Sequence, residues 1–243
     1  MKDVSSKFLT DIVASCFFGY EVKCFRNDES DFVNFTKNLF SHKVALLPFF
    51  RLFSYFFVPT FVSLFKLNFL DNTLLKKIII DTLYYRETNN VKRNDFIDLL
   101  KQLNTNCKED CEIEFGTDRL ISQLITFYIA GFETTSNAVA FALYELGLRT
   151  DCQDRLREEI LSIIKTEEDI TYENLQKLKY LDMVLSGDRF GLICAKIGLV
   201  YFLRKFKIDR CAETPDKMLL NPRSPFMVPL NGIKMTVHKS RYF

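Results

Sequence analysis

The apolar residues of this chain recur mostly at intervals of three and four positions, which is the spacing of one face of an α-helix. Most of residues 1–186 follow this pattern, with short polar turns between the expected helices. Towards the end of the chain it gives way to short apolar runs, with Asn231-Gly232 as a hairpin turn between strands expected at 226–228 and 233–237. The sequence therefore predicts a mainly α fold, a packed helical array with a small C-terminal β-sheet.

Capping residues and apolar stripes predict several helix boundaries. Asp71 or Asn72 can cap a helix that ends near residue 89, and a short helix is expected over 96–100. The first of these helices carries an apolar stripe formed by Leu75, Ile78, Ile79, Leu83 and Tyr84. Further along, the chain predicts a helix opened by a capping box at Thr150–Gln153, one from Thr171 to about Ser186, and one from Arg189 to Ile208.

The longest run without proline extends from about Asp118 to Leu148, enough for a helix of about 45 Å. This run is apolar on nearly all sides, so we expect it to be the central helix of the fold. One polar stretch interrupts it, Ala130-Gly131-Phe132-Glu133-Thr134-Thr135-Ser136. A buried carboxylate beside hydroxyl groups is costly unless it is hydrogen-bonded, so this stretch is the candidate for chemistry.

The polar stretch has the composition of a notch in the helix. Gly131 removes a side chain where something flat could lie against the backbone. The Thr134 hydroxyl can donate to the carbonyl of Ala130, four residues earlier, and bend the helix locally. Together with the carboxyl group of Glu133, these residues indicate a notch with a proton donor at its edge. Taken alone, the pattern also fits a kinked core helix with a satisfied polar cluster.

Charge and cysteine content exclude some classes of protein. Lys plus Arg is 33 against 31 acidic residues, and a net charge of +2 gives no reason to expect a nucleic-acid partner. The seven cysteines are odd in number and scattered, which favours reduced thiols facing the cytosol. Cys107 and Cys111 are close enough for a metal clip, but the sequence has only two histidines, His42 and His238, and no second cysteine pair at ligand spacing, so no metal site is predicted.

An aromatic stretch over 46–70 is a candidate for peripheral membrane contact. Arg51, Lys66, Pro48 and Pro59 interrupt it, and its longest uncharged run is shorter than the roughly 20 residues that cross a bilayer. Aromatic side chains favour the membrane interface, so the stretch could lie on a membrane surface without spanning it. An ordinary buried helix and loop fits the same residues.

The polar stretch at 130–136, followed by Phe141-Ala142-Leu143-Tyr144-Glu145-Leu146, resembles the central-helix signature of the cytochrome P450 superfamily. The resemblance is closest to the insect microsomal, xenobiotic-metabolising branch of that superfamily. Further segments resemble other parts of the family in the same order, namely 11–19, 85–100, 153–160, 172–186, 189–200 and 224–237.

The resemblance implies a haem-dependent, iron-containing monooxygenase. By this resemblance, Ala130 and Gly131 would border the oxygen-binding notch that faces the haem, while Glu133 and Thr134 would deliver protons to the bound oxygen. The family also implies a lipophilic small-molecule substrate, an electron-donating reductase, and the cytosolic face of the endoplasmic reticulum membrane. If the missing N-terminal anchor is decisive for that location, a cytoplasmic location is expected instead.

The sequence departs from the family directly after Ser186. There the family continues with Glu-x-x-Arg and, further on, with a glycine-rich loop whose cysteine binds the iron, whereas this chain continues with Gly187-Asp188-Arg189. If Gly187 aligns with the glycine two places after that cysteine, Leu185 stands at the ligand position, and leucine does not bind iron. Cys194 lies nine residues further on in an apolar setting, and we expect it to be buried.

Residues 1–243 are therefore expected to form a single partial domain with an internal deletion between 186 and 187, and without the N-terminal anchor region of the family. Two interpretations follow. In the first, the chain is a haem monooxygenase by descent. In the second, it is a haem-free helical remnant, such as a splice variant, a pseudogene product or a faulty gene prediction, which is inert or binds other proteins.

Overall fold

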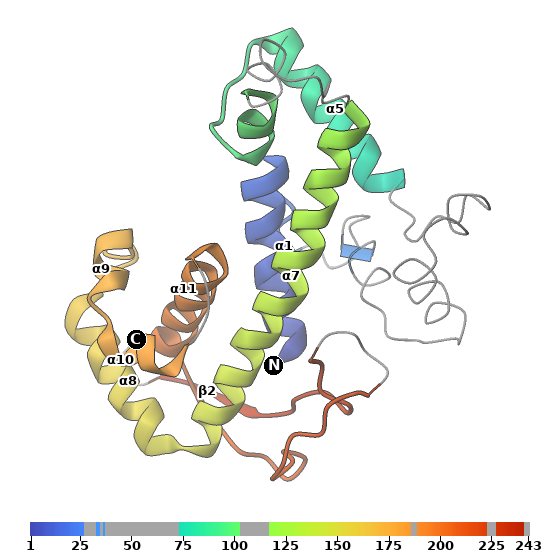
Figure 1. Cartoon of the computed structure of the whole chain (residues 1–243). Helices are drawn as coiled ribbons and strands as arrows, with labels where there is room; N and C mark the ends of the chain where they lie inside the picture. The colour runs from blue at the N-terminus through green and yellow to red at the C-terminus, as the bar shows by residue number, and fades with distance from the viewer. Residues whose placement is uncertain are drawn as a thin grey trace. The chain divides into compact units, whose positions relative to one another are not determined.

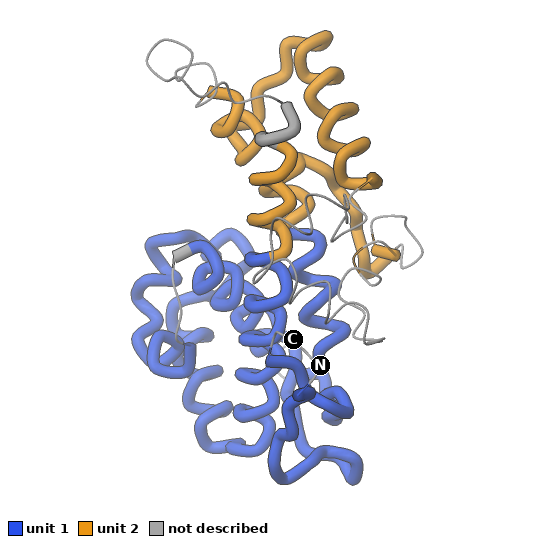
Figure 2. The backbone as a smooth tube through the Cα atoms, turned by 45° about the vertical axis from the view of Figure 1, so that its right-hand side comes forward, with its two compact units in different colours: residues 1–12, 130–243 blue, residues 13–129 orange. Residues whose placement is uncertain are grey.

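The computed structural model describes residues 1–26, 33–34, 36, 73–102, 117–185, 189–222 and 227–240. They divide into two compact units (Figure 2), one containing residues 1–12 and 130–243 and the other residues 13–129. Helices α1 (Lys2–Val13) and α7 (Thr117–Leu148) each contain a boundary between the units, so each supplies residues to both. The junction at 186–188 lies outside the described residues, and the single domain with an internal deletion stays a prediction.

In the unit of residues 13–129, α1 continues into a π-helical turn, η1 (Ala14–Phe18). The turn ends at Gly19, whose φ of 64° is a left-handed conformation that glycine adopts without strain. Helix α5 (Thr73–Asn89), helical residues 96–102 and the first part of α7 complete the described elements of this unit. Aromatic rings connect them, since Phe96 lies 5.3 Å from Phe17 and 4.7 Å from Phe127 between ring centroids.

Helix α5 confirms the predicted helix but corrects its apolar stripe. Leu75 and Ile79 are fully buried, whereas Tyr84 is 72% exposed, so the stripe is wrong at that position. Arg86, about three turns after Leu75, is buried instead. A sequence pattern of apolar residues misses this position because the charge of Arg86 is neutralised by residues that lie outside the helix, Asp95 and Asp98.

The other unit contains the second part of α7 and the helices and strands that follow, drawn from yellow-green to red in Figure 1. Helix α8 packs against α10 and α11, and α11 also contacts α9. The mainly α fold, the long α7 helix and the small sheet confirm the predicted fold class. The elements are α8 (Thr150–Ile163), α9 (Tyr172–Gln176), α10 (Lys179–Val184), α11 (Arg189–Lys205), β1 (Phe206–Asp209) and β2 (Thr236–Lys239).

The predicted hairpin is wrong. Strand β2 begins at Thr236 and pairs antiparallel with β1, so that Phe206 lies opposite Lys239 and Asp209 opposite Thr236. Of the strand predicted at 226–228, the structure describes residues 227–228, and these two form no regular strand. Leu220 and Pro229 make an isolated antiparallel bridge there. Proline lacks the N–H group that a longer ladder needs, which limits pairing at this point.

Gln153 explains two further differences from the sequence prediction. Helix α8 begins at Thr150 as expected, but its N-cap is Arg149, which makes no side-chain capping bond. The Gln153 side chain is buried and instead accepts the N–H of Ile208 at 2.9 Å and donates to the Ile208 carbonyl at 2.8 Å. These bonds hold the backbone extended at Ile208, so α11 ends at Lys205 rather than continuing to residue 208.

The predicted helix from Thr171 to Ser186 is divided into α9 and α10. Thr171 caps α9 as expected, since its side chain accepts the N–H of Asn174 at 3.3 Å. A residue of α8, Glu159, stabilises the start of the second helix. Its carboxylate accepts the N–H groups of Tyr180 at 2.8 Å and Leu181 at 3.1 Å. These two N–H groups belong to the first turn of α10, so Glu159 caps a new helix that the local sequence does not announce.

Some predictions fall on residues outside those described. They are the caps at Asp71 or Asn72, the aromatic stretch at 46–70, and the pair Cys107 and Cys111. Among the helices of the described residues, none is both long and apolar enough to span a membrane. Within those same residues, no three His, Cys, Asp or Glu side chains come together as a metal site would require.

Candidate functional site

The polar stretch of α7 presents two faces. Ala130 and Thr134, one turn apart, are exposed, and Gly131 beside them is partly exposed. Glu133 is only 1% exposed, and Ser136 and Asn137 are buried on the same side. Consecutive helical residues leave the axis about 100° apart, so Glu133 and Thr134 project in different directions although they are neighbours in sequence. The structure thus brings Ala130 and Thr134 together and separates them from Glu133.

The Thr134 hydroxyl donates to the Ala130 carbonyl at 2.6 Å, as predicted. This bond occupies the hydroxyl proton and competes with the helical hydrogen bond to the same carbonyl. The hydroxyl oxygen keeps its lone pairs free to accept a further bond on the exposed face. The chemical capacity of this face is therefore a positioned hydroxyl next to a small, partly exposed residue, Gly131.

Lys2, a residue of α1, binds the carboxylate of Glu133. Lys2 Nζ lies 3.2 Å from Glu133 Oε1 and donates to the Ser136 hydroxyl at 2.7 Å, while Asn137 Nδ2 donates to Glu133 Oε1 at 3.4 Å. Burial lowers the pKa of Lys2, and the nearby Glu133 carboxylate partly offsets that effect. The carboxyl group is consequently paired in the interior of the unit rather than presented with the hydroxyl of Thr134.

Two residues of this arrangement were missed by sequence reasoning. Asn137 follows Glu133 by four positions, which puts both on one helical face, so the spacing could have identified it. Lys2 lies in a segment far away in sequence, and nothing local predicts its contact with Glu133. Within the part of the chain that the structure describes, Asn137 Oδ1 is buried and accepts no hydrogen bond, which leaves one polar atom of the cluster unsatisfied.

Helix α11, which follows the junction, begins against the polar stretch of α7. A Cβ atom placed at Gly191 would lie 3.1 Å from Thr135 Oγ1, so glycine allows the two helices to approach closely here. A second close approach occurs at Gly198, where a Cβ atom would lie 2.8 Å from the Phe8 ring of α1. The helix after the junction therefore packs directly on α1 and α7.

The unit of residues 1–12 and 130–243 contains the thiols of Cys152, Cys194 and Cys211. Cys194 is 3% exposed on α11, which confirms that it is buried, and Leu185 is buried at the end of α10. Cys152 lies on α8, and Cys211 lies two residues after β1. A hydrogen bond with the Thr214 hydroxyl and backbone N–H groups lower the pKa of Cys211. Cys211 belongs to the loop that the sheet closes, where the Cys211 N–H donates to Thr214 Oγ1 and that oxygen lies 2.7 Å from the Lys234 carbonyl oxygen.

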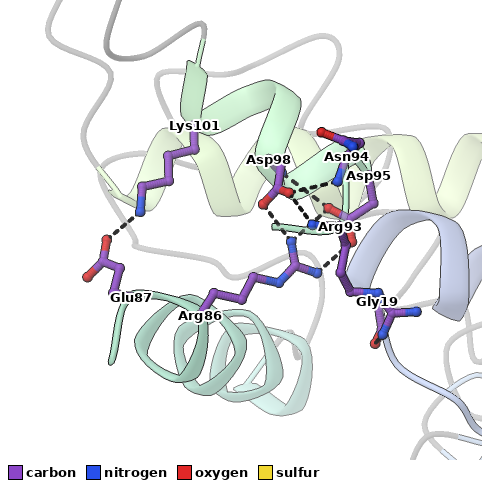
Figure 3. Close-up of polar contacts among 8 residues, drawn as sticks. All are labelled: Gly19, Arg86, Glu87, Arg93, Asn94, Asp95, Asp98 and Lys101. Atoms are coloured by element: carbon purple, nitrogen blue, oxygen red, sulfur yellow. Dashed lines mark hydrogen bonds and ion pairs between the residues drawn. The ribbon is translucent and has the colours of Figure 1, made fainter. Parts of the chain in front are cut away.

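A second polar cluster lies in the unit of residues 13–129 (Figure 3). Arg86 of α5 donates to Asp95 at 2.5 Å and to Asp98 at 2.8 Å. Asp98 also accepts the backbone N–H groups of Arg93 and Asn94. Burial raises the pKa of Asp98, but these two bonds and the Arg86 guanidinium outweigh it and hold the pKa below its usual value. Because every member is bonded within the cluster, its role is to fix the turn between α5 and residues 96–102.

Comparison with known proteins identifies the family. The sequence model of the cytochrome P450 family matches residues 1–186. "Cytochrome P450 6k1" of Blattella germanica is 35% identical over 99% of this chain and 66% of its own length. Two Drosophila melanogaster proteins are similar, "Cytochrome P450 6a2" at 34% identity over 76% of this chain and 38% of its length, and "Probable cytochrome P450 6a13" at 30% over 96% and 46%.

The chain thus spans between 38% and 66% of the length of these relatives. All three relatives are insect proteins, as the resemblance of the sequence predicted. Haem is the cofactor that this family implies. The match of the family over most of the chain, and the identity with relatives over nearly all of it, show that the chain belongs to the cytochrome P450 family as a partial member.

Proposed function

We propose that this chain derives from a haem-dependent monooxygenase of lipophilic small molecules, but that as it stands it does not hold a thiolate-ligated haem and has no monooxygenase activity of its own. The observation that carries the proposal is the junction after Ser186. Helix α10 ends at Val184 and α11 begins at Arg189, and no thiol stands between these two residues in the sequence.

The comparisons support an internal deletion at this junction. The family match ends at Ser186, the last residue before the departure from the family. The alignment with the Blattella germanica relative extends over 345 positions, whereas the chain has 243 residues and is aligned over 99% of its length. Part of the interior of that relative therefore has no counterpart in this chain. This is the result expected if the segment between residues 186 and 187 is missing.

In the described part of the unit of residues 1–12 and 130–243, the residues at and after the expected ligand position do not fit a thiolate-ligated haem. Leu185, at the predicted ligand position, is buried and carries no ligand atom. Cys194 is buried in the α11 face, in a setting that does not favour a thiolate. Cys211 has a lowered pKa but is held in the loop after β1 by Thr214, which itself is bonded to the Lys234 carbonyl. Ala130, Gly131, Glu133 and Thr134 are thus retained residues of the oxygen-activating helix without the cofactor that they would serve.

A lipophilic substrate, an electron-donating reductase and attachment to the cytosolic face of the endoplasmic reticulum membrane belong to the complete enzymes that the family resemblance implies. For this chain, we propose membrane-surface contact through the aromatic stretch at 46–70. Flotation of the purified chain with liposomes tests this contact. A chain that stays entirely at the bottom of the gradient would show that the stretch is core or loop.

The direct test of the main proposal is the haem content of the purified chain after incubation with haem. The proposal predicts no stoichiometric haem retained after gel filtration. One haem per chain, lost in the Cys194→Ser variant and kept in Cys152→Ser, would overturn it. Haem retained equally by both variants, with no change in spectrum on reduction with carbon monoxide, would indicate apolar adsorption and leave the predicted lack of activity standing.

A further inference from the structure

We propose that Lys196 of α11 and Asp182 of α10 form a register lock, an ion pair between a buried ammonium and a partly exposed carboxylate that sets the register of α11 relative to α10. Helix α10 ends at Val184 and α11 begins at Arg189, so the pair joins the last helix before the junction to the first helix after it. The ion pair acts on the folding of this chain, and its effect is measured in the haem-free protein. This inference therefore goes beyond the function proposed above.

The geometry connects three helices through one ammonium group. Lys196 is only 1% exposed, and its Nζ lies 2.5 Å from Asp182 Oδ1. The same nitrogen donates to the Leu175 carbonyl of α9 at 3.4 Å. The ammonium of α11 is thus bound by acceptors from both helices that precede the junction.

The pair is unequal in its exposure to water, since the Asp182 side chain is 42% exposed whereas Lys196 is almost fully buried. If Lys196 is replaced by an uncharged residue, the partly exposed Asp182 carboxylate can be hydrated by solvent. If Asp182 is replaced by an uncharged residue, the Lys196 ammonium stays in the interior and keeps its bond to the Leu175 carbonyl, and a buried charge without its counter-ion is strongly destabilising. Lys196 therefore needs the charge of Asp182 much more than Asp182 needs the charge of Lys196.

The position of Lys196 makes the pair sensitive to helix register. Lys196 lies about two turns into α11, and sliding α11 by one turn would move the ammonium by about 5.4 Å. That displacement is more than twice the distance from Nζ to Asp182 Oδ1. Apolar faces alone tolerate such a slide better than a buried ammonium paired with one carboxylate does, and setting register is the best-attested role of buried polar groups.

The experiment compares three variants by urea unfolding of the full chain without haem. Asp182→Asn should lower the ratio of folded to unfolded protein by at least about tenfold, because it leaves Lys196 buried and unpaired. Lys196→Met should change that ratio less than about threefold, and Lys196→Met in the Asp182→Asn background should restore it to within that range. The matched control is Glu167→Gln, which breaks the exposed pair that Lys205 of the same helix makes, and it should have almost no effect.

Hydrogen exchange separates a register lock from general stability. In Asp182→Asn, the amide groups of Asp182 and Leu185 in α10 should lose protection first, while those of the β1–β2 ladder keep theirs. Equal effects of Asp182→Asn and Glu167→Gln would overturn the proposal, as would a uniform loss of protection over the unit. If Asp182→Asn does not fold, recovery of folding in the double variant supports the lock, and failure of the double variant overturns it.

Discussion

The carboxylate of Glu133 is bound by the ammonium group of Lys2, with 3.2 Å between Lys2 Nζ and Glu133 Oε1. Glu133 is 1% exposed and Lys2 is 18% exposed, so the pair connects the beginning of α1 to the middle of α7 inside one unit. The acid that resembles a proton donor of the family is, in this chain, part of an interior contact between helices. That relationship can be tested independently of haem.

Lys2→Met should destabilise the chain by about 2 kcal/mol, less than for a fully buried pair because Lys2 keeps some contact with water. The loss arises because the Glu133 carboxylate remains buried without its cation. Glu133→Gln added to Lys2→Met should recover most of the stability, since the buried charge is then gone. Urea unfolding measures both changes. A loss no larger than that of Lys205→Met, which breaks an exposed pair, would show that Lys2 does not hold Glu133.

The lowered pKa of Asp98 should make the stability of the unit of residues 13–129 sensitive to acid. Its pKa is lowered from 3.8 in the folded chain, so the unfolded chain takes up a proton first as the pH falls. The stability that Asp98 contributes is fully present above about pH 4 and is lost as the pH falls through the lowered pKa. Asp98→Asn should therefore be less stable than the unchanged chain at neutral pH and should lose less stability between about pH 4 and pH 2.

The measurement for Asp98 is the unfolding midpoint in urea over that pH range. The matched control is Asp81→Asn, because Asp81 is exposed on the same helix, α5, as Arg86. Parallel pH curves for the Asp98→Asn variant and the unchanged chain would contradict the account, because the bonds from Arg93, Asn94 and Arg86 would then contribute nothing to stability in the folded state.

Met183 and Phe190, on the two sides of the junction, should make the chain prone to aggregation. Met183 is 70% exposed and Phe190 is 39% exposed. Apolar side chains left uncovered in this way bind hydrophobic dyes and other chains. Met183→Ser should lower dye binding and raise the protein concentration at which light scattering begins. The control is Thr171→Ala, which changes the exposed N-cap of α9 and should alter neither quantity. A sharp cooperative melt above about 65 °C without dye binding would contradict this expectation.

The sequence predicted the parts of the fold that local patterns determine. The 3.6-residue period located α5, α7 and α8, and the spacing from Ala130 to Thr134 predicted their hydrogen bond. The errors occurred where a distant side chain decides the local structure. Glu159 divides α9 from α10, Gln153 holds Ile208 in an extended conformation, and Lys2 binds Glu133. In each case the partner lies at least 21 residues away, beyond the range of any local pattern.

We propose that this chain does not form a thiolate-ligated haem, and the reduced carbon-monoxide difference spectrum of the chain reconstituted with haem is the decisive test. Leu185 at the expected ligand position and the burial of Cys194 predict a spectrum without the strongly red-shifted Soret band of a thiolate-bound iron. Cys211→Ser, at the thiol with a lowered pKa, should leave that spectrum unchanged. A strongly red-shifted band in the unchanged chain that disappears in Cys194→Ser would contradict the claim and restore the chain to the active haem enzymes.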